Sequence, residues 1–320
     1  MNLFAILAAL ALEQWRTFEW RASAEHAFVG YARGLERRLN GGTLGQGVIA
    51  TTLAIVPPVL VTALAWWLLA RAHPLLGLLF NVAVLYALMG FRRFSHAIST
   101  IIAALMSGDI VAARRALAAW NGGPTADLSS QEIARIATER GLAEAYRQVF
   151  AVMFWFVVLP GPAGAVMYRA AALLAAEWKG ALPGDDLSAL TRSLHVFGRP
   201  ARLLLWLLDW VPARLTALSF AIVGDFEDAA YCWRTQARAW PDGYGGEAIG
   251  AVLASGGGAL GVQLGGPLPG YGGEPEPRPE IGIGEAVEAE ILPSAVGLVW
   301  RALVLWLLLV FLLSLANWAP

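Results

Sequence analysis

The sequence predicts an all-α protein: a polytopic membrane bundle of about five transmembrane helices, joined by helical and Gly/Pro-rich polar segments. Three observations lead to this prediction. The mean hydropathy of the 320 residues is +0.57. Only 15% of them are charged, whereas a soluble domain carries about 25%. Several apolar runs also reach the roughly 20 residues that a helix needs to cross hydrocarbon. Such a chain has too little polar surface for a water-exposed globule.

Five apolar runs are expected to span the bilayer, with four or six spans as the alternatives. The five runs are residues 48–70, 74–90, 150–176, 200–224 and 295–317. The first two form a hairpin with a very short turn. The third contains Pro160-Gly161-Pro162, so it is either one kinked span or two half-helices. The first twelve residues are apolar but lack a signal-peptide pattern, and they predict a short helix at or in the bilayer.

The polar stretches between these runs are too long to be simple loops. Residues 91–108, 109–120 and 129–146 have helical patterns, and Ser129 or Ser130 is the expected N-cap of the third. The predicted organisation has six parts: an N-terminal membrane-associated helix and cytoplasmic segment (1–47), a transmembrane hairpin (48–91), a cytoplasmic helical segment (92–148), a transmembrane region with a Pro/Gly break (149–224), a polar Gly/Pro-rich segment (225–294) and a C-terminal transmembrane helix (295–320).

The distribution of arginine predicts the orientation. Residues 13–47 and 92–147 contain twelve arginines, whereas the turn between the first two spans contains only Arg71. Because short cytoplasmic segments are enriched in Lys and Arg, both segments are expected to face the cytoplasm. The prediction is a multi-pass protein of a bacterial inner membrane, with the lipid bilayer as its main partner. Beyond residue 177 the charges do not decide the side.

Charge and residue types exclude several functions. The net charge of −1 provides no field to attract nucleic acid, which is therefore not an expected partner. The single cysteine, Cys232, excludes an internal disulfide and a thiolate metal site within one chain. The four histidines have no metal-ligand spacing, so no metal-ligating residue is assigned.

A run of glycines admits two explanations. Gly256-x-Gly258-x-x-Gly261 formally matches a dinucleotide fingerprint, but no βαβ pattern surrounds it. Packing or a turn is the preferred explanation, since Gly257, Gly261 and Gly265 recur every four residues and would let helices approach closely. The alternative is a loop that cradles an anion. Gly258, Gly261, Gly265 and Gly266 are therefore ligand-binding candidates.

Charged residues within apolar runs are further candidates. Arg169 lies in the third run, and Asp209 and Arg214 lie in the fourth. A charge in hydrocarbon costs about 2.5–3.5 kcal/mol on insertion scales, so such residues usually face a cavity or a partner. Asp209 is too short to reach the interface, and a polar cavity near Arg169 is its expected location. Arg147, in the preceding polar segment, is a candidate contact for a phosphate.

Several motifs occur in a fixed order along the chain: Ser107-Gly108-Asp109-Ile110, Phe154-Trp155, the stretches 160–169 and 210–218, Gly258-Ala-Leu-Gly-Val-Gln-Leu-Gly-Gly-Pro267, and Arg278-Pro-Glu-Ile-Gly282. Together they resemble the CobD/CbiB family of cobalamin-biosynthesis membrane proteins. Leu12-Glu13 and the stretch 208–212 also resemble the related AmpE proteins. The resemblance implies a synthase that joins aminopropanol phosphate to a carboxylate of adenosylcobyric acid with ATP and Mg²⁺.

The chain departs from the family pattern at acidic positions. Gly123-Pro124-Thr125 replaces a usual Arg-Asp-Thr, and residues 143–148 replace Glu-Asn-Thr-Ser-Asp-Gly. We therefore expect a non-catalytic or regulatory, AmpE-like member with a retained pocket for a corrinoid or other phosphate-bearing ligand. No catalytic residue is assigned, and oligomerisation is left open. The alternative is a working synthase, with ATP and Mg²⁺, whose carboxylates come from Glu139, Glu144, Asp225 or Glu227.

Overall fold

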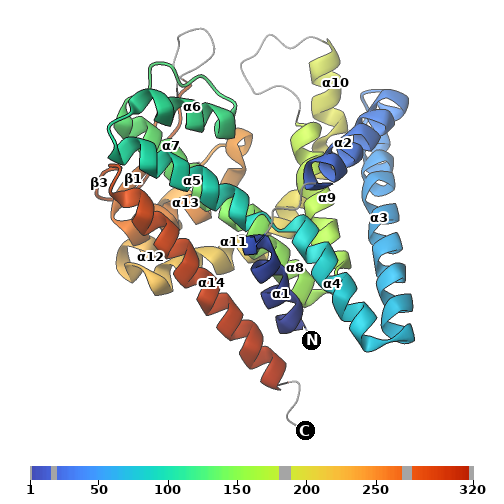
Figure 1. Ribbon diagram of the computed structural model, residues 1–320. Coiled ribbons are helices and arrows are strands. Elements are labelled where there is room, and N and C mark those ends of the chain that lie inside the picture. Colours follow the sequence, from blue (N-terminus) through green and yellow to red (C-terminus); the bar gives the residue numbers. More distant parts are fainter. Residues whose placement is uncertain (1, 16–19, 180–188, 269–275, 317–320) are drawn as a thin grey trace. The chain divides into compact units, whose positions relative to one another are not determined.

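The computed structural model describes residues 2–15, 20–179, 189–268 and 276–316 (Figure 1). The chain forms two compact units, Met1–Met89 with Ala151–Trp210, and Gly90–Phe150 with Val211–Pro320. The elements that lie mainly in the first unit are α1 (Asn2–Trp15), α2 (Trp20–Leu39), α3 (Leu44–Ala72), α4 (Pro74–Leu88), α8 (Ala151–Val158), α9 (Ala163–Glu177), α10 (Ala189–Phe197) and the first half of α11 (Arg199–Val223).

The second unit contains the remaining elements. They are α5 (Phe91–Met106), α6 (Ile110–Asn121), α7 (Ser130–Ala145), the π-helix η1 (Tyr146–Phe150), the end of α11, α12 (Phe226–Gln236), the 3₁₀ turns η2 (Ala237–Ala239) and η3 (Asp242–Tyr244), α13 (Gly246–Leu260), β1 (Val262–Gly265), β2 (Glu280–Gly282), β3 (Glu285–Ala286) and α14 (Ile291–Ala316).

The predicted fold class is confirmed, because the described chain is predominantly helical and four helices are long and apolar enough to cross a membrane. These helices are Leu44–Ala72, Ser130–Val158, Arg199–Val223 and Ile291–Ala316. The protein is therefore a membrane protein. Three of the five predicted spans correspond to α3, α11 and α14. The predicted span 74–90 forms α4, which has only 15 residues and is about 22 Å long, shorter than a full span.

The expected span at residues 150–176 is not one helix. Pro160-Gly161-Pro162 separates α8 from α9, which is the half-helix alternative, and the two helices pack against each other. A Cβ on Gly164 would lie 2.1 Å from the carbonyl oxygen of Trp155, so glycine is what allows this close approach. Gly161 has φ +70° and lies against the ring of Trp66 on α3.

The N-terminal part of that region, α8, belongs to a longer helix. Residues Ser130–Val158 form one helix of 29 residues, which passes from α7 through η1 into α8. The boundary expected at residue 148 therefore falls inside a helix. The physical reason is that no proline and only one glycine, Gly141, occur between these ends. The helix begins with a capping box between Ser129 and Glu132.

Proline inside α11 is accommodated by a neighbouring side chain. Pro212 has no N–H, so the carbonyl of Leu208 loses its helical donor. The indole Nε1 of Trp155 donates to this carbonyl at 3.1 Å. The backbone polar group is thus satisfied within the apolar part of the chain, as a membrane interior requires.

Helix α13 is the buried centre of the second unit. Three consecutive glycines meet three different neighbours: Gly256 faces Leu142 of α7, Gly257 faces Gly282 of β2, and Gly258 faces the backbone of Asp228 on α12. A Cβ at any of these positions would lie within 3.0 Å of the neighbour. Because glycine has no side chain, α13 can pack closely against several neighbours at once.

A small sheet follows α13, which the sequence did not predict. Its order is β2-β1-β3, with β1 antiparallel to β2 and parallel to β3. Gly265 pairs with Glu280 at the end of the antiparallel register. The strands have two to four residues, and two of their residues are glycines, so neither length nor alternation identifies them.

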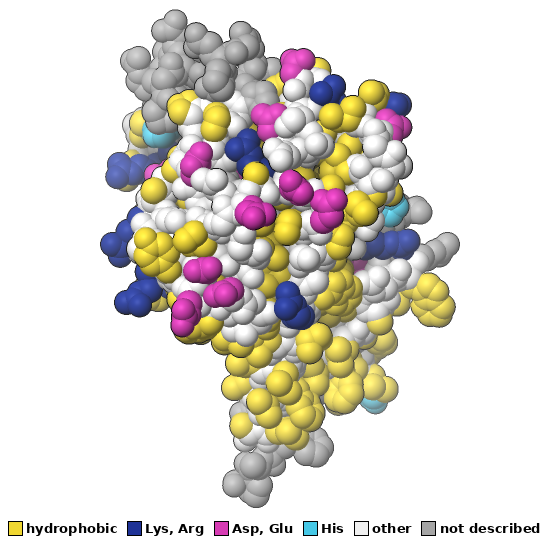
Figure 2. All heavy atoms as spheres, turned by 90° about the vertical axis from the view of Figure 1, so that its left-hand side faces the viewer, with side chains coloured by type: hydrophobic (Ala, Val, Ile, Leu, Met, Phe, Trp, Pro, Cys, Tyr) yellow, Lys and Arg dark blue, Asp and Glu magenta, His cyan; other side chains and the backbone are white. Residues whose placement is uncertain are grey.

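The surface of the second unit separates polar from apolar parts. Exposed leucines cover the C-terminal half of α14, where Figure 2 shows hydrophobic side chains almost without interruption. Acidic and basic side chains gather away from this end, over the part of the unit that carries the sheet. This distribution is the one expected for a helix that enters lipid below a water-exposed polar portion.

Candidate functional site

Asp209 and Arg169 both lie in buried polar contacts of the first unit. Asp209 is 3% exposed, and its Oδ1 accepts a hydrogen bond from the hydroxyl of Tyr168 at 2.8 Å. Arg169, the next residue on α9, points to a different partner: its Nη2 lies 2.6 Å from Oε1 of Glu25. The carboxylate that pairs with Arg169 is therefore Glu25 of α2, which the sequence analysis did not single out.

Arg169 is one member of a charged network. Arg21 lies 3.3 Å from Glu25 and 3.9 Å from Glu13, and it donates to the carbonyl oxygens of Leu88 and Met89 at the end of α4. Two arginines and two glutamates thus balance in charge and tie α1, α2, α4 and α9 together. Paired in this way, the charges avoid the penalty of isolated buried ions. The arrangement is typical of structural support.

Arg147 and Arg214 converge on the first turn of α13. The Nη2 atom of Arg147, in η1, lies close to Gly245, where a Cβ would be 2.7 Å away. Nη2 of Arg214 lies 2.8 Å from Oε1 of Glu247. The buried Nε of Arg147 has no hydrogen-bond partner among the described residues. These two predicted candidates therefore share one helix N-terminus, where Arg214 is already paired.

The candidate glycines divide into two groups. Gly258 packs inside α13, and Gly261 ends that helix with φ +67° and open space around its Cα. The fingerprint pattern thus lies in the last turns of a helix that precedes a strand, so it does not form the strand–loop–helix unit of a dinucleotide site. Gly265 and Gly266 lie beyond it, in a turn bound by charged side chains.

That turn is bound by Glu139 of α7 and two arginines. The Oε1 atom of Glu139 accepts the N–H of Gly265 at 2.8 Å. Its Oε2 lies 2.9 Å from Nη1 of Arg278. Arg135 donates to the carbonyls of Gly265 and of Pro267, and Nε of Arg278 donates to the carbonyl of Gly266 at 3.1 Å. The buried Glu139–Arg278 ion pair therefore binds both a backbone N–H and a backbone carbonyl of the turn.

Aromatic rings complete the environment of Arg278. Its guanidinium lies 5.1 Å from the ring centroid of Trp240 and 5.2 Å from that of Tyr244, within the range of a cation–π interaction. The hydroxyl of Tyr244 donates to Glu276. Burial, followed by this carboxylate, raises the pKa of Tyr244 to about 12. The tyrosine thus keeps its proton at all physiological pH values.

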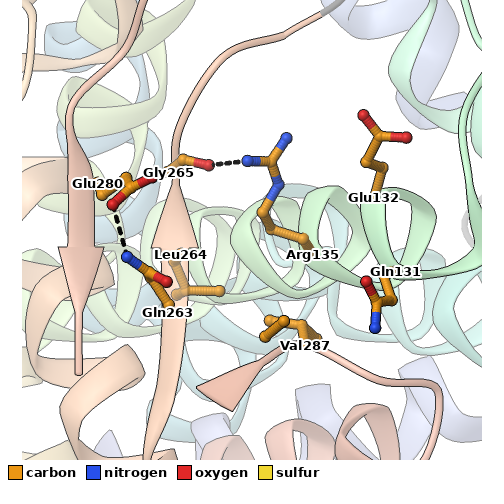
Figure 3. A pocket seen from close by; sticks show the side chains of 9 residues that line it. Gln131, Glu132, Arg135, Gln263, Leu264, Gly265, Glu280 and Val287 are labelled. Atoms are coloured by element: carbon orange, nitrogen blue, oxygen red, sulfur yellow. Dashed lines mark hydrogen bonds between the residues drawn. The ribbon is translucent and has the colours of Figure 1, made fainter. Parts of the chain in front are cut away.

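A cavity of about 170 Å³ opens beside the turn (Figure 3). It is lined by Gln131, Glu132 and Arg135 of α7, by Gln263, Leu264 and Gly265 of β1, by Glu280 of β2, and by Ala286 and Val287. Of the eight predicted candidates, only Gly265 lines it. The sequence signal that could have found it was the pair of family motifs at 258–267 and 278–282, because they form the two antiparallel strands of its wall.

The carboxylates of the cavity are spread over its walls. Within the part of the chain that the structure describes, no three His, Cys, Asp or Glu residues gather in a way that could hold a metal ion. The two carboxylates of the cavity, Glu132 and Glu280, lie on opposite sides of Arg135 in Figure 3. Glu144, named as a possible ligand, instead accepts hydrogen bonds from Trp120 and Gln148.

The fold and this site define a helical membrane protein whose polar portion is built around a glycine-rich helix and a small sheet. A family model for the CobD/Cbib protein matches residues 6–299. The chain belongs to the CobD/CbiB family, which confirms the resemblance found in the sequence.

Curated relatives agree over most of the chain. The chain is 37% identical to the cobalamin biosynthesis protein CobD of Stutzerimonas stutzeri over 313 residues, which cover 96% of this chain and 97% of the relative. It is 38% identical to CobD of Chromobacterium violaceum over 261 residues, 82% of this chain and 77% of the relative. The cobalamin biosynthesis protein CbiB of Salmonella typhimurium is 25% identical over 279 residues, 83% of this chain and 78% of the relative. No solved structure matches.

Proposed function

We propose that this protein acts in cobalamin biosynthesis, as the synthase that joins aminopropanol phosphate to a carboxylate of adenosylcobyric acid with ATP. The observation that carries the proposal is the similarity to a protein named for cobalamin biosynthesis along 97% of that protein's length. The new bond joins the amine nitrogen to the carboxyl carbon, and the departing oxygen leaves with a phosphate group of ATP.

The names of the curated relatives support this proposal over the regulatory, AmpE-like function. Two family motifs meet at one cavity, and the Gly265 turn between them is fixed by a buried ion pair. The regulatory function remains the second candidate, because the acidic positions at residues 143–148 differ from the family pattern.

Complementation separates the two functions. We expect the gene to restore growth on cobyric acid to a strain that lacks its own synthase, with the amide product identified by mass spectrometry. The control is the same gene carrying Gly265→Ala, at equal amounts in the membrane, which should not restore growth. Failure of the unmodified gene, with its membrane insertion verified, would favour the regulator.

We further propose a multi-pass arrangement in the bacterial inner membrane, with residues 13–47 and 92–147 in the cytoplasm. Single cysteines at Arg37, Val111 and His73, all at exposed positions, test this after Cys232→Ala. An impermeant maleimide applied to intact cells should label only the cysteine at position 73, and permeabilised cells should label all three. Ready labelling at positions 37 and 111 in intact cells would reverse the proposed orientation.

A further inference from the structure

Positive charge gathers at one end of the first unit. The stretches 33–40 and 177–202 contain seven Arg and Lys residues against four Asp and Glu, of which Asp185 and Asp186 lie outside the described residues. Two contacts bring the stretches together: Nε of Arg33 lies 2.5 Å from Oε1 of Glu177, and the hydroxyl of Ser193 donates to Oδ1 of Asn40 at 2.8 Å. Figure 1 shows α2 and α10 at this same end. The excess of cations is thus produced by the fold, because the two stretches are far apart in the sequence.

Arg202 holds this end together from within. Its guanidinium donates to the carbonyls of Trp178 and Lys179, at the end of α9, and of His195 in α10. Burial, followed by the positive charges of Arg202 and Arg199, lowers the pKa of His195. The imidazole is therefore neutral at pH 7, and the positive charge of this end comes from Arg and Lys. The basic cluster, as we call it, consists of the exposed residues Arg37, Arg38, Lys179 and Arg199.

An exposed apolar stripe on α11 begins directly after Arg199. It consists of Leu203, Trp206, Leu207 and Trp210, which follow Arg199 at intervals of four, seven, eight and eleven residues. These intervals place all five residues on one face of the helix. The four apolar residues are 48–57% exposed. Because α11 is long and apolar enough to cross a membrane, the stripe is a surface for acyl chains, and Arg199 lies where the polar headgroups begin.

We propose that the basic cluster and this stripe form a binding site for an anionic phospholipid, with the headgroup on the cluster and an acyl chain along the stripe. A soluble anion would leave the stripe without a partner, and an apolar partner would leave the cations without one. A phospholipid with net negative charge satisfies both, and each Lys or Arg at a membrane surface strengthens its binding about fivefold. Because Asn40 lies at this end, the orientation proposed above puts the site in the cytoplasmic leaflet.

Arg71 offers a comparison within the same unit. It is exposed, and it follows Leu64, Trp67 and Leu68 on α3, which are 47–57% exposed, so it too ends an apolar stripe of a spanning helix. Residues 39–91 contain no other Arg or Lys. A lone arginine can contact the phosphate of any phospholipid, whereas several cations together favour a headgroup with net negative charge. Selectivity among lipids is therefore expected at Arg199 and not at Arg71.

The test is native mass spectrometry of the purified full-length protein in detergent, with phosphatidylglycerol and phosphatidylethanolamine of identical acyl chains added in equal amounts. Phosphatidylglycerol has a net negative charge, and phosphatidylethanolamine is zwitterionic. We expect phosphatidylglycerol to bind at least about fivefold more tightly. Inorganic phosphate, compared with ammonium acetate at the same ionic strength, is the third probe and should not displace the lipid, because it has no acyl chain for the stripe.

Variants locate the site. Arg199→Gln should reduce the preference for phosphatidylglycerol about fivefold, and adding Lys179→Gln should reduce it further. Arg199→Lys keeps the charge and should keep most of the preference. Arg71→Gln, which removes an exposed arginine from the end of another apolar stripe, is the matched control and should leave the preference unchanged.

The outcomes decide for or against the lipid site. A preference for phosphatidylglycerol that depends on Arg199 and not on Arg71 supports it. Equal binding of the two lipids by the unmodified protein overturns it, and so does displacement of phosphatidylglycerol by inorganic phosphate. Equal losses in Arg199→Gln and Arg71→Gln also overturn it, because lipid would then bind alike at every basic helix end. None of these measurements involves ATP or a corrinoid, so the result stands whether or not complementation succeeds.

Discussion

Arg278→Ala is expected to destabilise the protein by about 3–5 kcal/mol, because it leaves the Glu139 carboxylate buried without its ionic partner. The side chains of Arg278 and Glu139 are only 4% and 7% exposed, so water cannot replace the lost interaction. The substitution also removes the donor to the Gly266 carbonyl and the cation between Trp240 and Tyr244. Urea-induced unfolding in detergent, followed by tryptophan fluorescence, measures the change.

Two further variants test whether the loss of the ion pair accounts for this loss of stability. Arg238→Ala is the control, because the side chain of Arg238 is 88% exposed and its loss should change stability by less than about 0.5 kcal/mol. The double variant Glu139→Gln with Arg278→Met removes both charges while the amide oxygen can still accept from Gly265. It should be more stable than Arg278→Ala alone. A single variant as stable as the unmodified protein would contradict a stabilising ion pair.

Gly265→Ala is expected to have the second large effect. Gly265 has φ +78°, and a Cβ there would lie 2.2 Å from the carbonyl oxygen of Pro279. An alanine in this backbone conformation costs about 1–2 kcal/mol, and the contact with Pro279 forces β1 and β2 apart in addition. We expect loss of the cavity, and therefore loss of growth in the complementation strain.

Gly261→Ala is the matched control for this substitution. Gly261 has a similar backbone conformation, φ +67°, but nothing lies within 4 Å of its Cβ position. Its alanine variant should show the backbone cost alone, and growth in the complementation strain should persist. The difference between the two variants measures the steric contact with Pro279. Equal behaviour of both would mean that the turn can move without affecting the cavity.

The sequence predicted the parts of the fold that depend on local composition. Long apolar runs identify α3, α11 and α14 because a span of hydrophobic residues leaves a helix few other environments. Ser129 was one of two expected caps, and it forms the capping box with Glu132. The packing role of Gly258 could also be predicted, since repeated small residues in an apolar helix usually allow close helix packing.

The parts that depend on distant contacts could not be predicted. Glu25, the partner of Arg169, is separated from it by 144 residues, and Glu139 and Arg278 are almost as far apart in the sequence. Nothing in the local pattern around Glu139 differs from an ordinary helical glutamate. The strands of the cavity are short, and they are defined by pairing between residues 262–265 and 280–286, which are distant in the sequence. The prediction of a polar Gly/Pro-rich segment for this region followed from composition alone.

The unbroken helix from Ser130 to Phe150 acts as a spacer for the polar site. Its first turns carry Gln131 and Arg135, which line the cavity, and its apolar continuation begins near Val149. At 1.5 Å per residue, Arg135 lies about 20 Å along the helix axis from that point. A rigid rod of this length keeps the cavity at a fixed distance from the apolar part of the same helix.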